Sequence, residues 1–139
     1  MAADQEHAGG CLCGSVRYMA RGPLRDVVFC HCSQCRRQTG LYFAATAVDK
    51  TAFTLTSEAG LRWYAASDFA LRGFCGTCGS VLFWKAHEVP HIAILAGSLD
   101  DPSQLKAGSH ICTEGRPSFY ALCDGLPQYP HAAPGLSIA

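Results

Sequence analysis

The chain has 139 residues, of which 49% are hydrophobic and 16% are charged, a composition that suits one globular domain with its own core. Eleven Lys and Arg residues balance eleven Asp and Glu residues, so no basic excess favours binding to nucleic acid or to an anionic membrane. The longest apolar run, residues 41–48, is far shorter than the ~20 residues that a membrane helix needs.

The opening segment, MAADQEHAGG, contains acidic side chains and no apolar core, so it is not expected to act as a signal peptide. The expected location is therefore the cytoplasm, where thiols stay reduced. We expect residues 1–8 to be a flexible N-terminal tail, residues 9–131 to form the domain, and residues 132–139 to be a C-terminal tail.

Short segments rich in β-branched or aromatic residues and bounded by Gly, Pro, Asp or Ser predict β-strands. In chain order they are residues 15–20, 26–30, 41–48, 52–56, 61–66, 69–75, 80–86 and 91–99. Helical signals are weak. Ser33 can cap a short helix that ends at Gly40. Asp101 can cap another, with Pro102 at its first position and Gly108 at its end. The sequence predicts a mainly β, single-domain fold with few short helices.

The nine cysteines are an odd number, so they cannot all pair within one molecule. This and the expected reducing compartment disfavour a disulfide scaffold and favour metal binding. Seven of the cysteines form three clusters: Cys11 and Cys13 in GGCLCGS, Cys30, Cys32 and Cys35 in FCHCSQCRRQTG, and Cys75 and Cys78 in GFCGTCGS. Cys112 and Cys123 stand alone, and we interpret them as buried strand cysteines.

The first and third clusters together have the composition of a structural zinc site. Zinc prefers four ligands in a tetrahedron, and each of these clusters offers a pair of thiolates followed by glycine. Gly14 permits the bend that brings the first pair together, and Gly79 can take the positive φ of a tight turn. The predicted structural zinc ligands are Cys11, Cys13, Cys75 and Cys78, and this zinc would pin the N-terminal strand to the middle of the sheet.

The middle cluster offers three thiolates, Cys30, Cys32 and Cys35, and no obvious fourth ligand. A zinc ion with three protein ligands and one open position is typical of a catalytic site. The alternative is a closed site with a fourth ligand from His31, Cys112, Cys123 or a distant histidine. We disfavour His31 because it lies between two ligands and would have to reach the same metal from the opposite face.

Arg36 and Arg37 directly follow the middle cluster. They can offset the negative charge of the thiolates or hold a carboxylate of a substrate. The competing interpretation, which we weigh equally, is a solvated face or hydrogen bonding to the sulfur atoms.

Four segments carry a resemblance to a known family: GGCLCGSVRY (9–18), CHCSQCRRQTG (30–40), GFCGTCGSVLFW (73–84) and SHICTEGRPSFYALCDGLPQYP (109–130). They resemble the glutathione-dependent formaldehyde-activating enzymes, whose domain is shared with centromere protein V. The resemblance implies a zinc-stapled β-sheet fold of the Mss4-like type. It also implies two zinc ions per chain, a structural one at the first and third clusters and a catalytic one at the middle cluster. The tail departs from the pattern, because the aromatic residue expected after Pro117 is displaced to Phe119.

The activity that the resemblance implies is that of a carbon–sulfur lyase, which forms or cleaves a thiol–aldehyde adduct such as S-hydroxymethylglutathione. The expected partners are a small thiol such as glutathione and an aldehyde, with no nucleic acid and no membrane. His31 or His110 can shuttle protons, although a structural role is favoured for each. The alternative function is a non-catalytic binding module in which both zinc ions are structural. The sequence does not indicate the oligomeric state.

Overall fold

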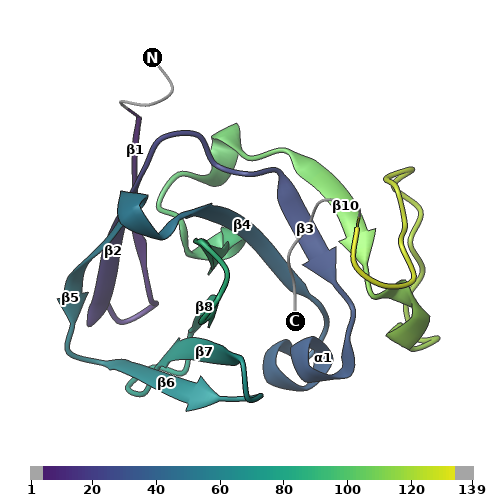
Figure 1. Ribbon diagram of the computed structural model, residues 1–139, viewed down its shortest axis with the longest axis horizontal. Helices are drawn as coiled ribbons and strands as arrows, with labels where there is room; N and C mark the ends of the chain where they lie inside the picture. Colours follow the sequence, from purple (N-terminus) through teal and green to yellow (C-terminus); the bar gives the residue numbers. More distant parts are fainter. Residues whose placement is uncertain (1–4, 134–139) are drawn as a thin grey trace.

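The computed structural model describes residues 5–133, and this part of the chain is mainly β, as the sequence predicts. The strands form a sheet of three and a sheet of seven, and α1 (Ser33–Thr39) follows the third strand (Figure 1). The strands are β1 (Glu6–Gly10), β2 (Val16–Arg21), β3 (Val27–Cys30), β4 (Phe43–Asp49), β5 (Phe53–Glu58), β6 (Leu61–Ala65), β7 (Ala70–Cys75), β8 (Val81–Ala86), β9 (His91–Leu95) and β10 (Ala107–Ile111).

The eight predicted strands are confirmed as β2 to β9, and two further strands, β1 and β10, were not expected. The expected N-terminal tail is wrong for residues 6–8, because β1 begins at Glu6 and pairs with β2. An ion pair between Glu6 and Arg21, with 3.1 Å between Oε2 and Nε, adds to this pairing. Residues 1–4 and 134–139 of the two expected tails lie outside the described part.

The small sheet has the order β1-β2-β5 and is antiparallel throughout. Its strand β5 alternates strictly between half-buried and exposed residues, which is the pattern of a strand with one face on a core. The strand that the sequence predicts over residues 52–56 is therefore confirmed as β5, with one face on the core.

The large sheet has the order β10-β3-β4-β9-β8-β7-β6. Its neighbouring strands are antiparallel, except that β10 runs parallel to β3. After β10 the chain turns back, and residues 127–131 bond to the free edge of β10 through backbone groups of His110 and Cys112. In Figure 1 this yellow segment lies beside the green β10.

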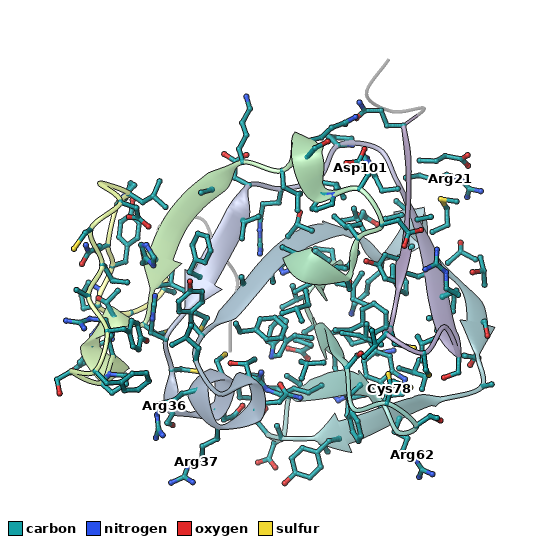
Figure 2. The ribbon with its side chains drawn as sticks, turned by 180° about the vertical axis from the view of Figure 1, so that it is seen from behind. Arg21, Arg36, Arg37, Arg62, Cys78 and Asp101 are labelled. Atoms are coloured by element: carbon teal, nitrogen blue, oxygen red, sulfur yellow. The ribbon has the colours of Figure 1, made fainter. Side chains whose placement is uncertain are left out.

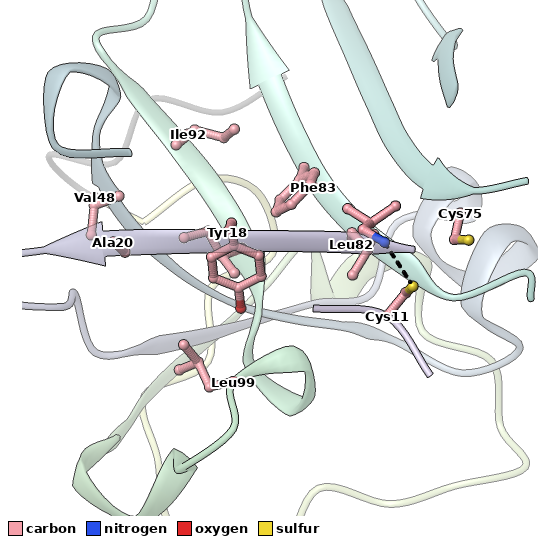
Figure 3. Close-up of a cluster of buried hydrophobic side chains, with 11 residues drawn as sticks. Cys11, Tyr18, Ala20, Val48, Cys75, Leu82, Phe83, Ile92 and Leu99 are labelled. Carbon is pink, nitrogen blue, oxygen red and sulfur yellow. Dashed lines mark hydrogen bonds between the residues drawn. The ribbon is translucent and has the colours of Figure 1, made fainter. Parts of the chain in front are cut away.

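The hydrophobic core fills the space between the two sheets. Tyr18 of β2 lies at its centre, edge-on to Phe83, with the ring centroids 5.4 Å apart (Figure 3). Tyr18 also stacks on Phe53, with the ring centroids 5.6 Å apart. The Tyr18 hydroxyl bonds to the Ser98 hydroxyl at 2.6 Å, so its only polar atom is satisfied. Burial raises the pKa of Tyr18 to about 12.

The other face of the large sheet carries small side chains at its centre. Ala45 of β4 and Ala93 of β9 are buried there and leave space above the sheet. Trp84 of β8 lies opposite Ala93, and Arg72 of β7 lies opposite Trp84, so one row of side chains crosses the sheet. The helix α1 lies at the end of this face, where β3 leads into it (Figure 1).

The predicted helix after Cys32 is confirmed, and Gly40 ends it with a φ of 88°. The expected helix after Asp101 is only a short 3-10 turn, Pro102–Gln104, capped by the Asp101 carboxylate. It ends before Gly108 because that glycine belongs to β10. No helix within residues 5–133 is both long and apolar enough to span a membrane.

Candidate metal centres

Four cysteines from two distant segments meet at the edge of the core. The Sγ atoms of Cys11, Cys13, Cys75 and Cys78 all lie within 4.8 Å of one another. Two of the sulfur–sulfur distances are 3.6 and 3.8 Å. A tetrahedral zinc ion with Zn–S bonds of about 2.3 Å separates its sulfur ligands by about 3.8 Å. The structure therefore brings together the four cysteines that the sequence grouped as one site.

Two glycine turns shape this first cluster. Gly14 and Gly79 have φ values of 84° and 83°, the conformation in which a side chain is strained. The Gly79 N–H donates to the carbonyl of Cys75 at 2.8 Å and closes the turn. The Val16 N–H donates to the Cys11 sulfur at 3.2 Å (Figure 3), so the backbone itself stabilises negative charge on that sulfur.

Hydroxyl groups also favour thiolates in the first cluster. The Ser80 hydroxyl lies 3.2 Å from the Cys78 sulfur and lowers the pKa of Cys78 to about 5. The Ser15 hydroxyl, 3.2 Å from the Cys75 sulfur, lowers the pKa of Cys75 to about 7. Gly60 leaves room for these groups, since a Cβ there would lie 2.9 Å from the Cys75 sulfur. Two of the four sulfur atoms therefore ionise more readily than usual, and the thiolate is the form that binds metal.

The second cluster forms where β3 passes into α1. Cys30 ends β3, Cys32 is the N-cap of α1, and Cys35 lies in the first turn of the helix. Their Sγ atoms lie within 4.8 Å of one another. The Cys35 N–H donates to the Cys32 sulfur at 3.4 Å. The N-cap of α1 is therefore Cys32, whereas the sequence suggested Ser33. Cys32 can take this role because a thiolate can accept the same helix N–H.

Hydrogen bonds link the thiols of the second cluster to one another. Hydrogen bonds from Cys30 and then Cys35 lower the pKa of Cys32 to about 2. The pKa of Cys30 is raised, first by its hydrogen bond with the Cys112 thiol and then by those with Cys32 and Cys35. One sulfur of the cluster therefore ionises readily, and metal binding must release the protons of the others.

The candidates for a fourth ligand do not join the group of three sulfur atoms in the second cluster, although the Cys112 thiol bonds to one of them, that of Cys30. The two ring nitrogens of His31 bond to Tyr120 at 2.6 Å and to His110 at 2.8 Å, so His31 is not directed at a metal. Cys123 is exposed, and Cys112 is half-buried with a left-handed backbone, so neither is the buried strand cysteine we had expected. Among residues 5–133, no fourth Cys, His, Asp or Glu atom shares the 4.8 Å group.

Arg72 is the buried cation beside the second cluster. Its side chain is 5% exposed, and its Nη2 donates to the Cys35 sulfur at 3.4 Å. Its remaining bonds go to the side-chain carbonyls of Gln34 and Gln38, and its guanidinium lies 5.5 Å from the centroid of the Phe43 ring. Arg72 has no carboxylate partner within residues 5–133, so its charge is available to offset that of the thiolates. Sequence reasoning missed Arg72, whose link to Cys35 exists only in the fold.

A cavity of about 260 Å³ opens beside the second cluster, over the alanine face of the large sheet. All three cysteines of the cluster line it. Its apolar walls include Phe43, Phe69 and Trp84, and its basic groups are Arg25, Arg72 and His91. A ligand in this cavity would therefore lie against the three sulfur atoms and between cationic groups.

Both clusters fit zinc on the chemistry of their donors. Each consists of cysteine sulfur alone, and thiolates select zinc and other thiophilic metals over the hard cations that prefer oxygen. The first cluster supplies a complete set of four, and the second supplies three.

The comparisons with known proteins assign the family. The model of the family described as "Glutathione-dependent formaldehyde-activating enzyme" matches residues 6–115. The chain belongs to this family. An uncharacterized lyase of Schizosaccharomyces pombe (strain 972 / ATCC 24843) is 32% identical over 80 residues, which are 57% of this chain and 57% of the yeast protein. The aligned part thus spans little more than half the length of that relative.

A crystal structure of a Rhodobacter sphaeroides protein shares the fold of this family member. The TM-score is 0.58 at 24% sequence identity, and the match covers 72% of this chain and 98% of the other. At this identity the likeness supports the fold alone. The expected family and the mainly β, single-domain fold are both confirmed.

The two arginines that the sequence singled out in this family member lie outside the cavity. Arg36 is half-buried and Arg37 is exposed, and both project away from the body of the protein below α1 (Figure 2). Neither lines the cavity, where Arg25 and Arg72 supply the guanidinium groups instead. Substrate binding by Arg36 and Arg37 stays a prediction.

A buried hydrogen-bonded chain joins the tail of the family domain to the second cluster. Asp124 Oδ2 accepts from His110 Nε2 at 2.8 Å, and His110 in turn bonds to His31 at 2.8 Å. His31 also bonds to the Tyr120 hydroxyl. Burial, together with the charge of His110, lowers the pKa of His31 to about 4, so this ring is neutral. The chain holds His31, which lies between Cys30 and Cys32, and its members were not grouped from sequence because they are far apart along it.

Proposed function

We propose that this family member is a zinc-dependent carbon–sulfur lyase that forms or cleaves a thiol–aldehyde adduct, such as S-hydroxymethylglutathione, in the cavity beside Cys30, Cys32 and Cys35. The observation that carries the proposal is the contrast between the two clusters. One has four thiols, enough for a complete tetrahedron, whereas the other has three thiols on the wall of a cavity. A three-ligand zinc with an open position is the arrangement found in catalytic sites.

Two further findings support the same reaction class. The description of the family model names a glutathione-dependent formaldehyde-activating enzyme, and the fission-yeast relative is named a lyase. The cavity suits a small organic substrate, because its walls are mostly apolar and its basic groups are few. It can therefore bury an adduct and exclude water from the carbon–sulfur bond.

A zinc ion held by the three cysteines would bind the substrate sulfur and stabilise it as a thiolate. Adduct formation makes one bond, from the sulfur to the carbonyl carbon, and the carbonyl oxygen takes up the proton that the thiol lost. Cleavage reverses these changes. Arg72 stabilises the thiolates through Cys35, and the aromatic walls position the small carbon fragment.

The test compares adduct turnover with the spontaneous reaction, since thiols add to formaldehyde without help. Exchange between glutathione, formaldehyde and S-hydroxymethylglutathione can be followed by exchange NMR, with zinc content measured on the same samples. We expect the zinc-loaded protein to accelerate the exchange. Cys35→Ser should abolish the acceleration, and Cys123→Ser, a matched change at an exposed cysteine, should keep it.

The opposite result would identify a different kind of protein. If the wild-type chain holds two zinc ions and does not accelerate the exchange, the lyase proposal is wrong and the domain is a zinc-stabilised binding module.

A further inference from the structure

The cavity beside the second cluster carries more positive charge than the cluster needs. Arg25 and Arg72 line it, and its lining includes no Asp or Glu. Neither arginine forms an ion pair within residues 5–133. Three thiolates and one Zn²⁺ together carry a charge of about −1, which the contact between Arg72 and Cys35 offsets. The charge of Arg25 is left without a partner.

Arg25 is fixed in place by its own backbone. Its N–H donates to the carbonyl of Ala47 at 3.2 Å, and its carbonyl accepts from the Thr46 hydroxyl at 2.6 Å. Its Nη2 donates to the carbonyl of Ala45 at 3.1 Å. Its Nε is buried and has no hydrogen-bond partner within the described residues. A buried donor without a partner is destabilising, so an anionic ligand beside this guanidinium would be stabilised.

Other basic groups gather around Arg25. Burial lowers the pKa of His91, and the charges of Arg25 and Lys50 lower it further. Burial also lowers the pKa of Arg25 itself. Lys50 donates to the carbonyl of Ala86 at 2.6 Å. Like the two arginines, Lys50 has no carboxylate partner among the described residues. This end of the cavity lacks an anion.

The sheet register gives the backbone spacing between the position beside Cys30 and the position that holds Arg25. Cys30 lies opposite Phe43 on β4, and Ala45, which accepts the Arg25 hydrogen bond, is two residues further along that strand. Two strand residues span about 7 Å. A metal–sulfur bond of about 2.3 Å and a chain of a few carbon atoms cover that span.

We propose that Arg25, together with His91, binds the carboxylate of the thiol substrate, so that this site selects small thiols with a carboxylate a few bonds from the sulfur. The proposal rests on the proposed function, because it takes the sulfur of the same substrate to the second cluster. The cavity of about 260 Å³ lies at the lower end of ligand-site volumes, so it takes the thiol arm and one carboxylate, and the rest of a larger thiol extends past the partly exposed Phe69.

The test measures thiol binding to the zinc-loaded protein by isothermal titration calorimetry. The probes are 3-mercaptopropionate and its uncharged analogue 3-mercaptopropionamide, which differ only in the charged group. We expect the carboxylate to bind at least about tenfold more tightly, the effect of one good charge-assisted hydrogen bond. Arg25→Met should remove this difference and leave the binding of the amide unchanged. Arg62→Met, at an exposed arginine of β6, is the matched control and should keep the difference.

The outcomes separate the two proposals. If both probes bind equally well, or if Arg25→Met keeps the preference for the carboxylate, the anion site is wrong and the lyase proposal stands. If neither probe binds the zinc-loaded protein, both proposals fail.

A third arm asks whether the carboxylate belongs to the aldehyde instead. Glyoxylate supplied together with 3-mercaptopropionamide forms an adduct whose carboxylate lies on the aldehyde carbon. If this adduct shows a gain that depends on Arg25 and 3-mercaptopropionate does not, the assignment to the thiol is overturned.

Discussion

Replacing Arg72 with methionine should weaken metal binding at the second cluster and leave the first cluster unaffected. Methionine keeps a long, flexible side chain of similar reach but loses the charge and the donors. The lost interaction is the bond from Nη2 to the Cys35 sulfur, made by a side chain that is 5% exposed and therefore poorly screened. A hydrogen bond to a charged group contributes about 1.5–3 kcal/mol, so the zinc affinity of this cluster should fall by about tenfold to a hundredfold.

The assay is competition for zinc with a chromophoric chelator of known affinity, started from the fully loaded protein. Wild type should release its zinc in two steps, and Arg72→Met should shift the easier step to lower chelator concentration without moving the harder one. Arg21→Met, which removes an exposed arginine at the end of β2 away from the first cluster, should move neither step. Identical release curves for Arg72→Met and wild type would show that the buried guanidinium does not stabilise the thiolates.

Three further predictions test other parts of the structure. Cys78→Ser should lower the thermal midpoint more than Cys35→Ser, because structural zinc binding is coupled to folding, and equal losses would contradict the division between the clusters. His110→Phe should cost about 2 kcal/mol of the free energy of unfolding in urea, since it leaves a buried donor unsatisfied and frees Asp124. Because burial raises the pKa of Tyr18 from its ordinary value of about 10 to about 12, its contribution to stability is complete below about pH 10 and is lost as the pH rises towards about 12. The free energy of unfolding of Tyr18→Phe should therefore fall less steeply than that of the wild type as the pH rises towards about 12, and equal slopes would contradict this.

The strands and the cysteine clusters could be predicted from the sequence because their signals are local. Short runs of β-branched or aromatic residues bounded by turn residues marked β2 to β9, and the spacing of the cysteines grouped them into sites of four and three. The strand β10 escaped prediction because its sequence, AGSHI, has little β propensity. It is a strand because β3 supplies a parallel partner that is distant along the chain.

The basic lining of the cavity could not be predicted for the same reason. Arg36 and Arg37 attracted attention because they adjoin the cysteines in sequence, yet they point away from the fold (Figure 2). Arg72 reaches Cys35 only because of the order of the strands in the large sheet. This order places β7 two strands from β9, and the Arg72 side chain extends over the face of the sheet on which Cys35 lies. Arg25 lines the cavity and donates to the carbonyl of Ala45, a residue 20 positions further along the chain. Contacts of this kind depend on register, which composition and motif spacing do not encode.

The most direct test of the central claim is to count sulfur ligands by X-ray absorption at the zinc edge, with and without a thiol. Seven cysteine ligands on two zinc ions give an average of about 3.5 sulfur atoms per zinc in the protein alone. If the second cluster accepts a substrate thiol, the average should rise to about 4 when 3-mercaptopropionate is added. An average of about 4 before any thiol is added would contradict an open position, and an average that stays at about 3.5 with saturating thiol would contradict thiol binding at the metal.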